Sequence, residues 1–359
     1  MINATCAMVR LAFLGFICGV VLSCLTVQAR EFDSQRIIAM HVHTAGIGAG
    51  NSGCFVSPSL QNSYKFGFYL RAFGVSESEL RNEGDGLVFK RISEGVAASG
   101  SVDQAVVLAM DGVIDERGSV DETRTQVYVP NDFVWQETNR YPNLLYGASI
   151  NPYRLDALER LTAAHANGAV LIKWIPAIMD IDPADPKISP FYQALAELKL
   201  PLLIHVGQER SFGEAQDELG DPVRLELPLS LGVTVIAAHI ASTGKNNGEG
   251  NFECLLPLFQ RFENLYTDIS SLTQINKLGY LSDALKVSGL ADRLIYGSDW
   301  PLQFFPLVSP WFQLGRVSPR TLWTVTKHKN KWERDVALKR AMGVPDPVFT
   351  RSARVLNVQ

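Results

Sequence analysis

The chain has 359 residues, of which 47% are hydrophobic and 19% are charged, and its formal net charge at pH 7 is −4. A chain of this length and composition can bury a large core, which excludes a disordered, solvating polymer. The small negative charge provides no basic field for a phosphate backbone, so nucleic acid is excluded as a partner.

The first 29 residues differ from the rest of the chain. Nineteen uncharged residues lie between Arg10 and Arg30 and end in the small-residue pattern Val27-Gln28-Ala29. This predicts a secretory signal peptide over residues 1–29, and therefore an exported protein, periplasmic in a bacterium, with no stable membrane association after cleavage. The alternative is an uncleaved membrane anchor, because nineteen such residues can just span a bilayer. The remaining cysteines, Cys54 and Cys254, are too few for a disulfide scaffold, and the sequence leaves their pairing open.

Beyond the signal, short apolar or β-branched runs alternate with amphipathic helical segments, which is typical of parallel strands joined by helical crossovers. The runs cover residues 36–43, 104–110, 144–150, 169–174, 202–207, 233–240, 265–270 and 293–299. Eight βα units predict an α/β fold, a closed (β/α)₈ TIM barrel, which allots about 31 residues to each unit.

The spacing of the runs supports one barrel domain over residues 30–359. His205 follows Lys173 by 32 residues, whereas Lys173 follows His43 by 130 residues. The long interval predicts an insertion of roughly 40 residues, which we assign to the mostly helical segment 60–98 beside the barrel mouth. The tail from Val317 is predicted to be helical.

Five polar residues fall at the carboxyl ends of predicted strands, where barrel enzymes hold their chemistry. They are His41, His43, His205, His239 and Asp299. Residues 41 and 43 share one face of a strand, so both imidazoles can point into the barrel mouth. Imidazole and carboxylate suit a divalent metal, zinc first with manganese or iron as alternatives, and we expect one ion rather than two. We expect the cage to consist of His41, His43, His205 and Asp299, with a water in the open position that would ionise near pH 7.

Four segments now carry a family resemblance: "MHVH" (40–43), "LIHVG" (203–207), "VIAAHIAS" (235–242) and "YGSDWPL" (296–302). In this ordered set the chain resembles the amidohydrolase superfamily, within it the amidohydrolase-related branch of TIM-barrel metal-dependent enzymes that includes aminocarboxymuconate semialdehyde decarboxylase. The resemblance implies that the same four residues hold the metal. It also implies that His239 lies just outside, orienting water or polarising the substrate, and that Asp299 shuttles a proton as general base.

Lys173 ends the fourth strand, and the sequence allows three roles for it. The resemblance implies that a lysine here can be carbamylated and bridge two metals. A free ammonium would repel a dication. Lys173 would then turn toward a carboxylate such as Glu209, or bind an anionic group of the substrate.

Other residues just past strand ends are candidates for substrate binding. Arg210 could bind a carboxylate, Glu209 lies beside it, and Trp174 and Trp300 could form the wall of an apolar site. The alternative is that the tryptophans pack in the barrel rim and that Arg210 is solvated or ion-paired.

These observations predict a metal-dependent hydrolase that uses an activated water on an amide, lactone or ester of a small molecule. The first alternative is a nonoxidative decarboxylase of an aromatic or unsaturated carboxylic acid, which uses the same cage. The second is a non-catalytic exported metal-binding protein, which the intact cage argues against. A homo-oligomer remains open, because the sequence does not determine assembly.

Overall fold

The computed structural model describes residues 35–303 and 306–358, so the predicted signal peptide lies outside the described residues. Within the described ranges, no helix is both long enough and apolar enough to cross a membrane. Cys54 and Cys254 are both free thiols, which answers the question that the sequence left open.

The eight predicted strands are all present and form one parallel sheet, which confirms the predicted fold class. In sheet order they are β1 (Ile38–His43), β3 (Gln104–Leu108), β5 (Leu144–Ala148), β6 (Leu171–Trp174), β7 (Leu202–Ile204), β8 (Val235–Ala237), β11 (Leu265–Asp268) and β12 (Leu294–Ile295). Backbone bonds join the two ends of this sheet, because His43 N donates to Trp300 O and Asp299 N donates to His41 O. These bonds close the sheet into a TIM barrel.

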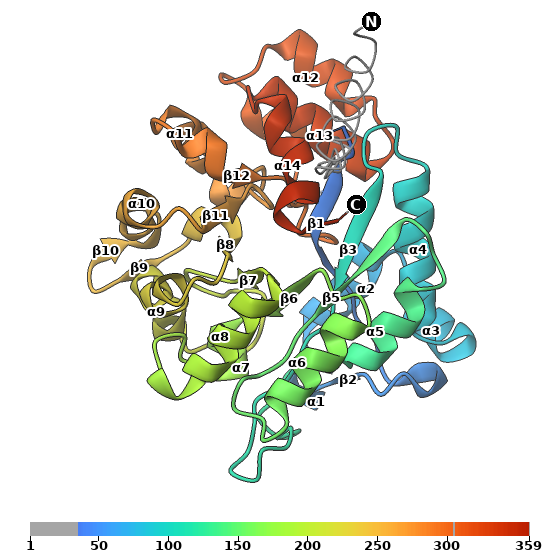
Figure 1. Ribbon diagram of the computed structural model, residues 1–359. Helices are drawn as coiled ribbons and strands as arrows, with labels where there is room; N and C mark the ends of the chain where they lie inside the picture. Colours follow the sequence, from blue (N-terminus) through green and yellow to red (C-terminus); the bar gives the residue numbers. More distant parts are fainter. Residues whose placement is uncertain (1–34, 304–305, 359) are drawn as a thin grey trace, which may run out of the picture. The chain divides into compact units, whose positions relative to one another are not determined.

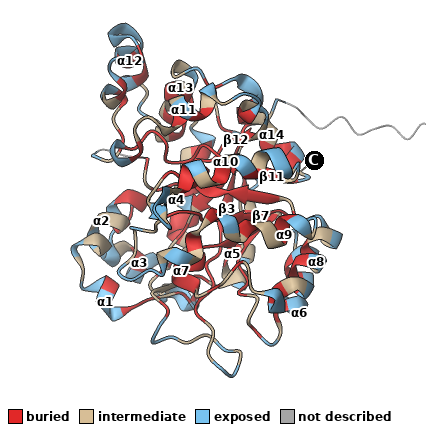
Figure 2. Ribbon diagram, turned by 90° about the vertical axis from the view of Figure 1, so that its left-hand side faces the viewer, coloured by how far each residue is buried: buried red, intermediate tan, exposed pale blue. Residues whose placement is uncertain are grey.

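Helices surround the strands, as Figure 1 shows, and Figure 2 shows that the strands are buried while the helices expose one side to solvent. The helices after β3 are α5 (Asn131–Thr138), α6 (Ala157–Ala166), α7 (Pro176–Met179), α8 (Ser189–Leu198), α9 (Glu226–Ser230), α10 (Asn251–Arg261), α11 (Tyr280–Lys286), α12 (Pro319–Thr326), α13 (Lys331–Ala341) and α14 (Asp346–Val355). The last three confirm the predicted helical tail. Two small antiparallel pairs, β2 (Phe55–Val56) with β4 (Val127–Tyr128) and β9 (Lys245–Asn246) with β10 (Glu249–Gly250), lie in the loops.

The barrel interior is filled by side chains that alternate along the strands, as the two-residue repeat of a strand requires. The apolar residues of this cluster include Ile38, Met40, Val106, Leu108, Leu171, Leu203, Ile236 and Ile295. Ala353, Val355 and Leu356, in and just after α14, belong to the same cluster, so the tail seals one end of the barrel. The chemistry is therefore confined to the other end.

The segment between β1 and β3 is helical, as predicted. It contains α1 (Pro58–Gln61), α2 (Tyr64–Phe73), α3 (Glu77–Glu83) and α4 (Gly86–Ala97). The last of these, α4, contacts β3 and α5, so it serves as the crossover helix of the first barrel unit. The extra material that reaches the barrel mouth is α1 and α2.

Candidate active site

The polar residues of the site continue the inward face of the strands. Lys173 lies two positions after the inward-facing Leu171, and His205 two positions after Leu203. Because side chains alternate along a strand, both polar groups enter the barrel above the apolar interior. On β1 the pairing register shifts between Ala39 and Val42, so the ladder is irregular there, as is common next to active sites.

His41 is oriented by Asp268, a residue to which the sequence analysis gave no role. Its Nδ1 lies 2.7 Å from Oδ2 of Asp268, and both side chains are fully buried. Since an ionised carboxylate only accepts hydrogen bonds, Nδ1 carries the proton and Nε2 keeps its lone pair. Gly297 permits this contact, because a Cβ at that position would lie 2.8 Å from Oδ2 of Asp268 and 3.1 Å from Cβ of His41.

Nε2 of His41 is the point at which the other groups converge. His43 Nε2 lies 3.1 Å from it, Lys173 Nζ 3.2 Å and Asp299 Oδ1 3.7 Å. His43 Nε2 and Asp299 Oδ1 are 3.3 Å apart. One ligand atom from each of His41, His43 and Asp299 therefore lies within the range of a common metal ion.

The backbone is turned sharply where His239 and Asp299 leave their strands. His239, Ile240 and Ala241 have φ values of 54°, 49° and 52°, and Asp299 has a φ of 59°. Residues other than glycine rarely adopt this left-handed conformation, and it is enriched at functional sites. The backbone turn at His239 is stabilised because His239 N donates to Asp268 Oδ1 at 2.7 Å.

A chain of hydrogen bonds also fixes the ring of His239. The hydroxyl of Ser270 donates to Asp268 Oδ1 at 2.8 Å, so its oxygen accepts from Nδ1 of His239 at 2.7 Å. This assigns the proton to Nδ1 and leaves Nε2 as an acceptor. Burial, reinforced by the charge of Lys277, holds the pKa of His239 well below its ordinary value, so the ring is neutral at pH 7.

His205 lies beside His239, with ring centroids 5.3 Å apart, and is outside the compact group of His41, His43 and Asp299. Its Nε2 is buried and has no hydrogen-bond partner among the described residues, and the nearest carboxylate oxygen, on Glu209, is 3.5 Å away. A buried nitrogen without a partner is costly unless a ligand satisfies it. This orphaned atom and the convergent nitrogen and oxygen donors together fit a divalent cation.

Lys173 points at His41, with its Nζ 3.2 Å from His41 Nε2. Glu209 accepts from Ser211 N at 2.6 Å and lies 3.5 Å from His205 Nε2, and among the described residues no ion pair joins it to Lys173. Lys173 is also absent from the residues that line the cavity, so a contact with the substrate stays a prediction. Burial lowers its pKa to about 8, against the opposing charges of Asp268 and Asp299. Carbamylation of Lys173 stays a prediction.

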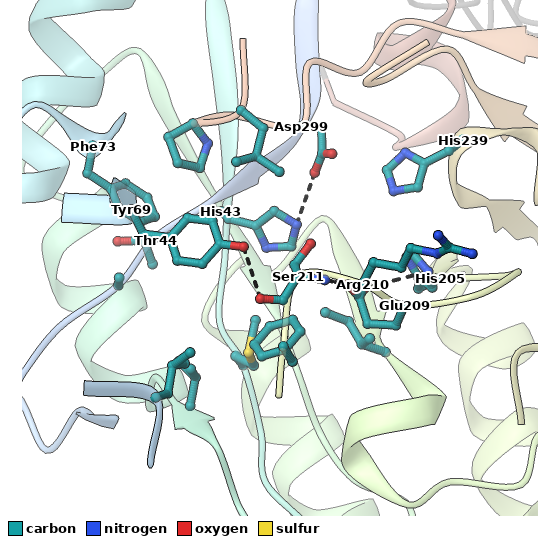
Figure 3. Close-up of a pocket in the computed structure, with 18 of the residues that line it drawn as sticks. His43, Thr44, Tyr69, Phe73, His205, Glu209, Arg210, Ser211, His239 and Asp299 are labelled. Carbon is teal, nitrogen blue, oxygen red and sulfur yellow. Dashed lines mark hydrogen bonds and ion pairs between the residues drawn. The ribbon is translucent and has the colours of Figure 1, made fainter. Parts of the chain in front are cut away.

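A cavity of about 170 Å³ opens onto the site. Figure 3 shows His43, His239 and Asp299 on one side of it, with Tyr69 and Phe73 from α2 opposite. Its apolar lining includes Leu60, Phe66, Leu70, Phe73, Met110, Ile175 and Phe212, and its polar lining includes His205, Glu209, Arg210, Asn276 and Lys277. A mostly apolar pocket with a few convergent polar groups is the usual form of a small-molecule site.

The two tryptophans predicted as substrate contacts do not line this cavity. Trp174 is fully buried, donates its Nε1 hydrogen to Ile150 O at 2.7 Å and stacks on Phe191. Trp300 stacks on Trp332 with ring centroids 4.9 Å apart. Strand alternation explains Trp174, because its neighbour Lys173 takes the inward position. Arg210 does line the cavity, but its guanidinium is exposed and hydrogen-bonds Gln208.

Several site residues escaped the sequence analysis, among them Asp268 and Lys277. The signal for Asp268 was available: a carboxylate at the carboxyl end of an apolar strand, two positions after Tyr266, which packs against the barrel interior. Lys277 lies in a loop turn, η6 (Ile275–Lys277), where no strand or helix pattern fixes the direction of a side chain.

Comparison with known proteins places the chain in a family. The family model described as "Amidohydrolase" matches residues 97–317, which is more than half of the chain. The chain belongs to the amidohydrolase family. This confirms the resemblance at the family level, while the likeness to aminocarboxymuconate semialdehyde decarboxylase stays a prediction. No curated protein matches this amidohydrolase.

Solved structures support the fold of this amidohydrolase. An uncharacterized TIM-barrel protein from Bordetella bronchiseptica is 18% identical, with a TM-score of 0.52 over 85% of this chain and 99% of its own. The IDCase of Metarhizium anisopliae is 14% identical, with a TM-score of 0.51 over 90% and 97% of the two chains. A candidate 2-pyrone-4,6-dicarboxylic acid hydrolase from Pseudomonas putida is 15% identical, with a TM-score of 0.50 over 90% and 98%. At these identities the likeness shows the fold alone.

Proposed function

We propose that this amidohydrolase is a metal-dependent hydrolase of a small-molecule amide, lactone or ester. The observation that carries the proposal is the hydrogen-bond chain from Asp268 through Ser270 to His239, beside the group of His41, His43 and Asp299. The chain leaves His239 as a proton acceptor next to a cavity large enough for a small substrate.

His41, His43 and Asp299 would hold the cation, with His205 completing the set. A divalent cation bound there lowers the pKa of water and polarises a carbonyl oxygen. We propose zinc, with manganese or iron as alternatives that the donor set also accepts, and one ion.

The residues of the chain perform the proton transfers. Asp299 is buried, which alone would raise its pKa, but the neighbouring His239 and His43 hold that pKa well below its ordinary value. Asp299 is therefore ionised and His239 is neutral at pH 7, so both can accept a proton from water and later return one to the leaving group. A decarboxylase instead requires a proton donor for carbon at the start of its reaction. The proton transfers of hydrolysis can therefore be assigned to these two groups.

The first test is metal content, measured by elemental analysis of protein purified without chelators, for the wild type and for Lys173→Ala. One metal in both supports the mononuclear site. Two in the wild type, falling in the variant, would establish a carbamylated bridge instead.

The second test is the reaction itself, on a panel of neutral lactones, esters and amides in ¹⁸O-labelled water. Incorporation of ¹⁸O into the acid product supports hydrolysis. Release of carbon dioxide from carboxylic acids, without hydrolysis of any member of the panel, would replace the proposal by the decarboxylase alternative. Absence of both, with full metal content, would leave the non-catalytic alternative.

We further propose that the mature protein is exported, periplasmic in a bacterium, after removal of residues 1–29. The support is the sequence pattern of that segment. Amino-terminal sequencing and fractionation of expressing cells test this, and an intact amino terminus in the membrane fraction would show the anchored alternative. Sedimentation of the same material shows whether the protein is a homo-oligomer.

A further inference from the structure

Lys277 is a buried cation to which the proposed reaction gives no contact with the substrate. It is 7% exposed, lines the cavity and stands at the end of η6, in the loop after β11. Its Nζ donates to Ser271 Oγ at 2.9 Å. A lysine almost never becomes this buried without a carboxylate partner.

No described carboxylate forms an ion pair with Lys277. Asp299 and Glu209 act on it only from a distance, and they raise its pKa less than burial lowers it. Lysine has three donors, and the one hydrogen bond to Ser271 leaves two of them without a partner in the described part of the chain. A buried ammonium in this state lacks a compensating anion.

Gln274, which directly precedes η6, also has a buried polar atom without a hydrogen-bond partner among the residues that the structure describes. Gln274, also a lining residue and 5% exposed, has an amide nitrogen that is buried and makes no hydrogen bond within the described residues. A buried ammonium that uses one of its three donors and a buried amide nitrogen that uses none, three residues apart, indicate a site for an acceptor that is not part of the chain.

We propose that Lys277 recognises an anionic group of the ligand, and that the substrate is a carboxylate-bearing small molecule with an apolar body. The proposal deepens the proposed function, on which its description of the ligand as a substrate rests. A carboxylate supplies the charge and the acceptor oxygens that Lys277 lacks. The apolar body would lie against Leu60, Phe66 and Phe73, which form part of the same cavity.

The position of Lys277 relates the anion to the reacting groups. Ser271 Oγ, which accepts from Lys277, lies 3.2 Å from Nδ1 of His239, so one serine hydroxyl separates the ammonium from that ring. An anion on Lys277 therefore orients the substrate beside the proton acceptor. Binding a carboxylate to a cation stabilises its charged form, which suits a carboxylate that survives the reaction rather than one that is lost.

The test measures binding rather than turnover, with benzoate and the neutral, isosteric benzamide as probes on metal-loaded protein by calorimetry. The wild type is expected to bind benzoate more tightly than benzamide. Lys277→Met should lower the affinity for benzoate by about tenfold or more, as expected for the loss of a charge-assisted hydrogen bond, and leave the affinity for benzamide unchanged. Lys277→Arg should retain most of the preference. Because Lys277→Met removes an uncompensated buried charge, it should fold and melt at the wild-type temperature or above.

The matched control is Lys90→Met, since Lys90 is an exposed lysine of α4 that does not line the cavity. It should bind both probes like the wild type. Equal affinity of the wild type for benzoate and benzamide, or benzoate binding that survives Lys277→Met, overturns the inference. If the wild type hydrolyses nothing but still prefers benzoate through Lys277, the proposed function fails while the anion site stands.

Discussion

Asp268 positions two imidazoles with its two oxygens. Oδ2 lies 2.7 Å from Nδ1 of His41, and Oδ1 accepts from the backbone N of His239, also at 2.7 Å. One buried carboxylate thus sets the donor nitrogen of a metal ligand and the turn that presents the proton acceptor. The two histidines stack with centroids 5.1 Å apart, so a shift of one disturbs the other.

Asp268→Asn should weaken metal binding about 10- to 100-fold, as is typical when the partner of a ligating histidine is lost. The amide has only one acceptor oxygen and cannot hold both contacts. Competition with a chromophoric chelator measures the affinity. Asp283→Asn is the control, because Asp283 is an exposed residue of α11. An unchanged metal affinity in Asp268→Asn would show that His41 is held by other contacts.

Gly297→Ala should disturb the contact between His41 and Asp268 by a steric clash. Its Cβ would lie 2.8 Å from Oδ2 of Asp268, so the carboxylate or the chain must move. We expect lower metal affinity and a destabilisation of about 1–3 kcal/mol, the usual cost of overpacking. Urea unfolding together with the chelator assay checks both. Gly67→Ala is the control, because a Cβ there meets nothing within 4 Å.

His239→Asn should reduce turnover by about 10²- to 10⁴-fold, the usual contribution of general acid–base catalysis, and leave the metal content unchanged. Asparagine tolerates the positive φ at this position better than most residues, so the backbone turn should survive. Elemental analysis and kcat on a hydrolysed substrate are the two measurements. A metal-free variant would make His239 a ligand and favour a binuclear site.

Tyr69→Phe should raise KM roughly fivefold without loss of metal, since one net hydrogen bond contributes about 1 kcal/mol. The Tyr69 hydroxyl donates to Ser211 O at 2.9 Å and so joins α2 to the loop after β7 across the cavity. Tyr64→Phe is the matched control, because Tyr64 is 88% exposed. A fall in kcat with KM unchanged would contradict a role limited to substrate binding.

The metal-free protein should lose stability in mild acid. Burial, with the charge of Lys173, lowers the pKa of His41 from 6.5 to about 4. Between these two pKa values His41 binds a proton in the unfolded chain but not in the folded protein. As the pH is lowered from 6.5 to about 4, the free energy of unfolding therefore falls by up to about 3 kcal/mol. Urea unfolding at pH 7 and pH 5 measures this. His41→Gln should reduce the pH dependence without abolishing it, because the pKa values of His239 and His205 are also lowered. An equally steep dependence in that variant would assign the whole effect to those two groups.

The sequence predicted the barrel and the principal donors because both follow from the two-residue repeat of a strand. Lys173 and His205 extend inward-facing rows that begin at Leu171 and Leu203, and such rows are visible in the sequence. The same alternation, applied fully, would have turned Trp174 away from the cavity and brought Asp268 into the site.

Loop residues could not be predicted in this way. The position of Lys277 and the hydrogen bond from Tyr69 to Ser211 depend on where η6 and α2 lie relative to the barrel mouth, which tertiary packing decides. The approach of His41 to Asp268 likewise depends on contacts 227 residues apart in the chain. Spacing along the sequence carries no such information.

The helices α1 and α2 form part of the cavity wall, whereas the groups that would hold the metal belong to the strand ends. Recognition and chemistry are therefore encoded in separate stretches of the gene. Substitutions or length changes in residues 58–73 could redirect the enzyme to new substrates while the reaction centre is inherited intact. The specificity of related barrels should accordingly diverge first in this segment.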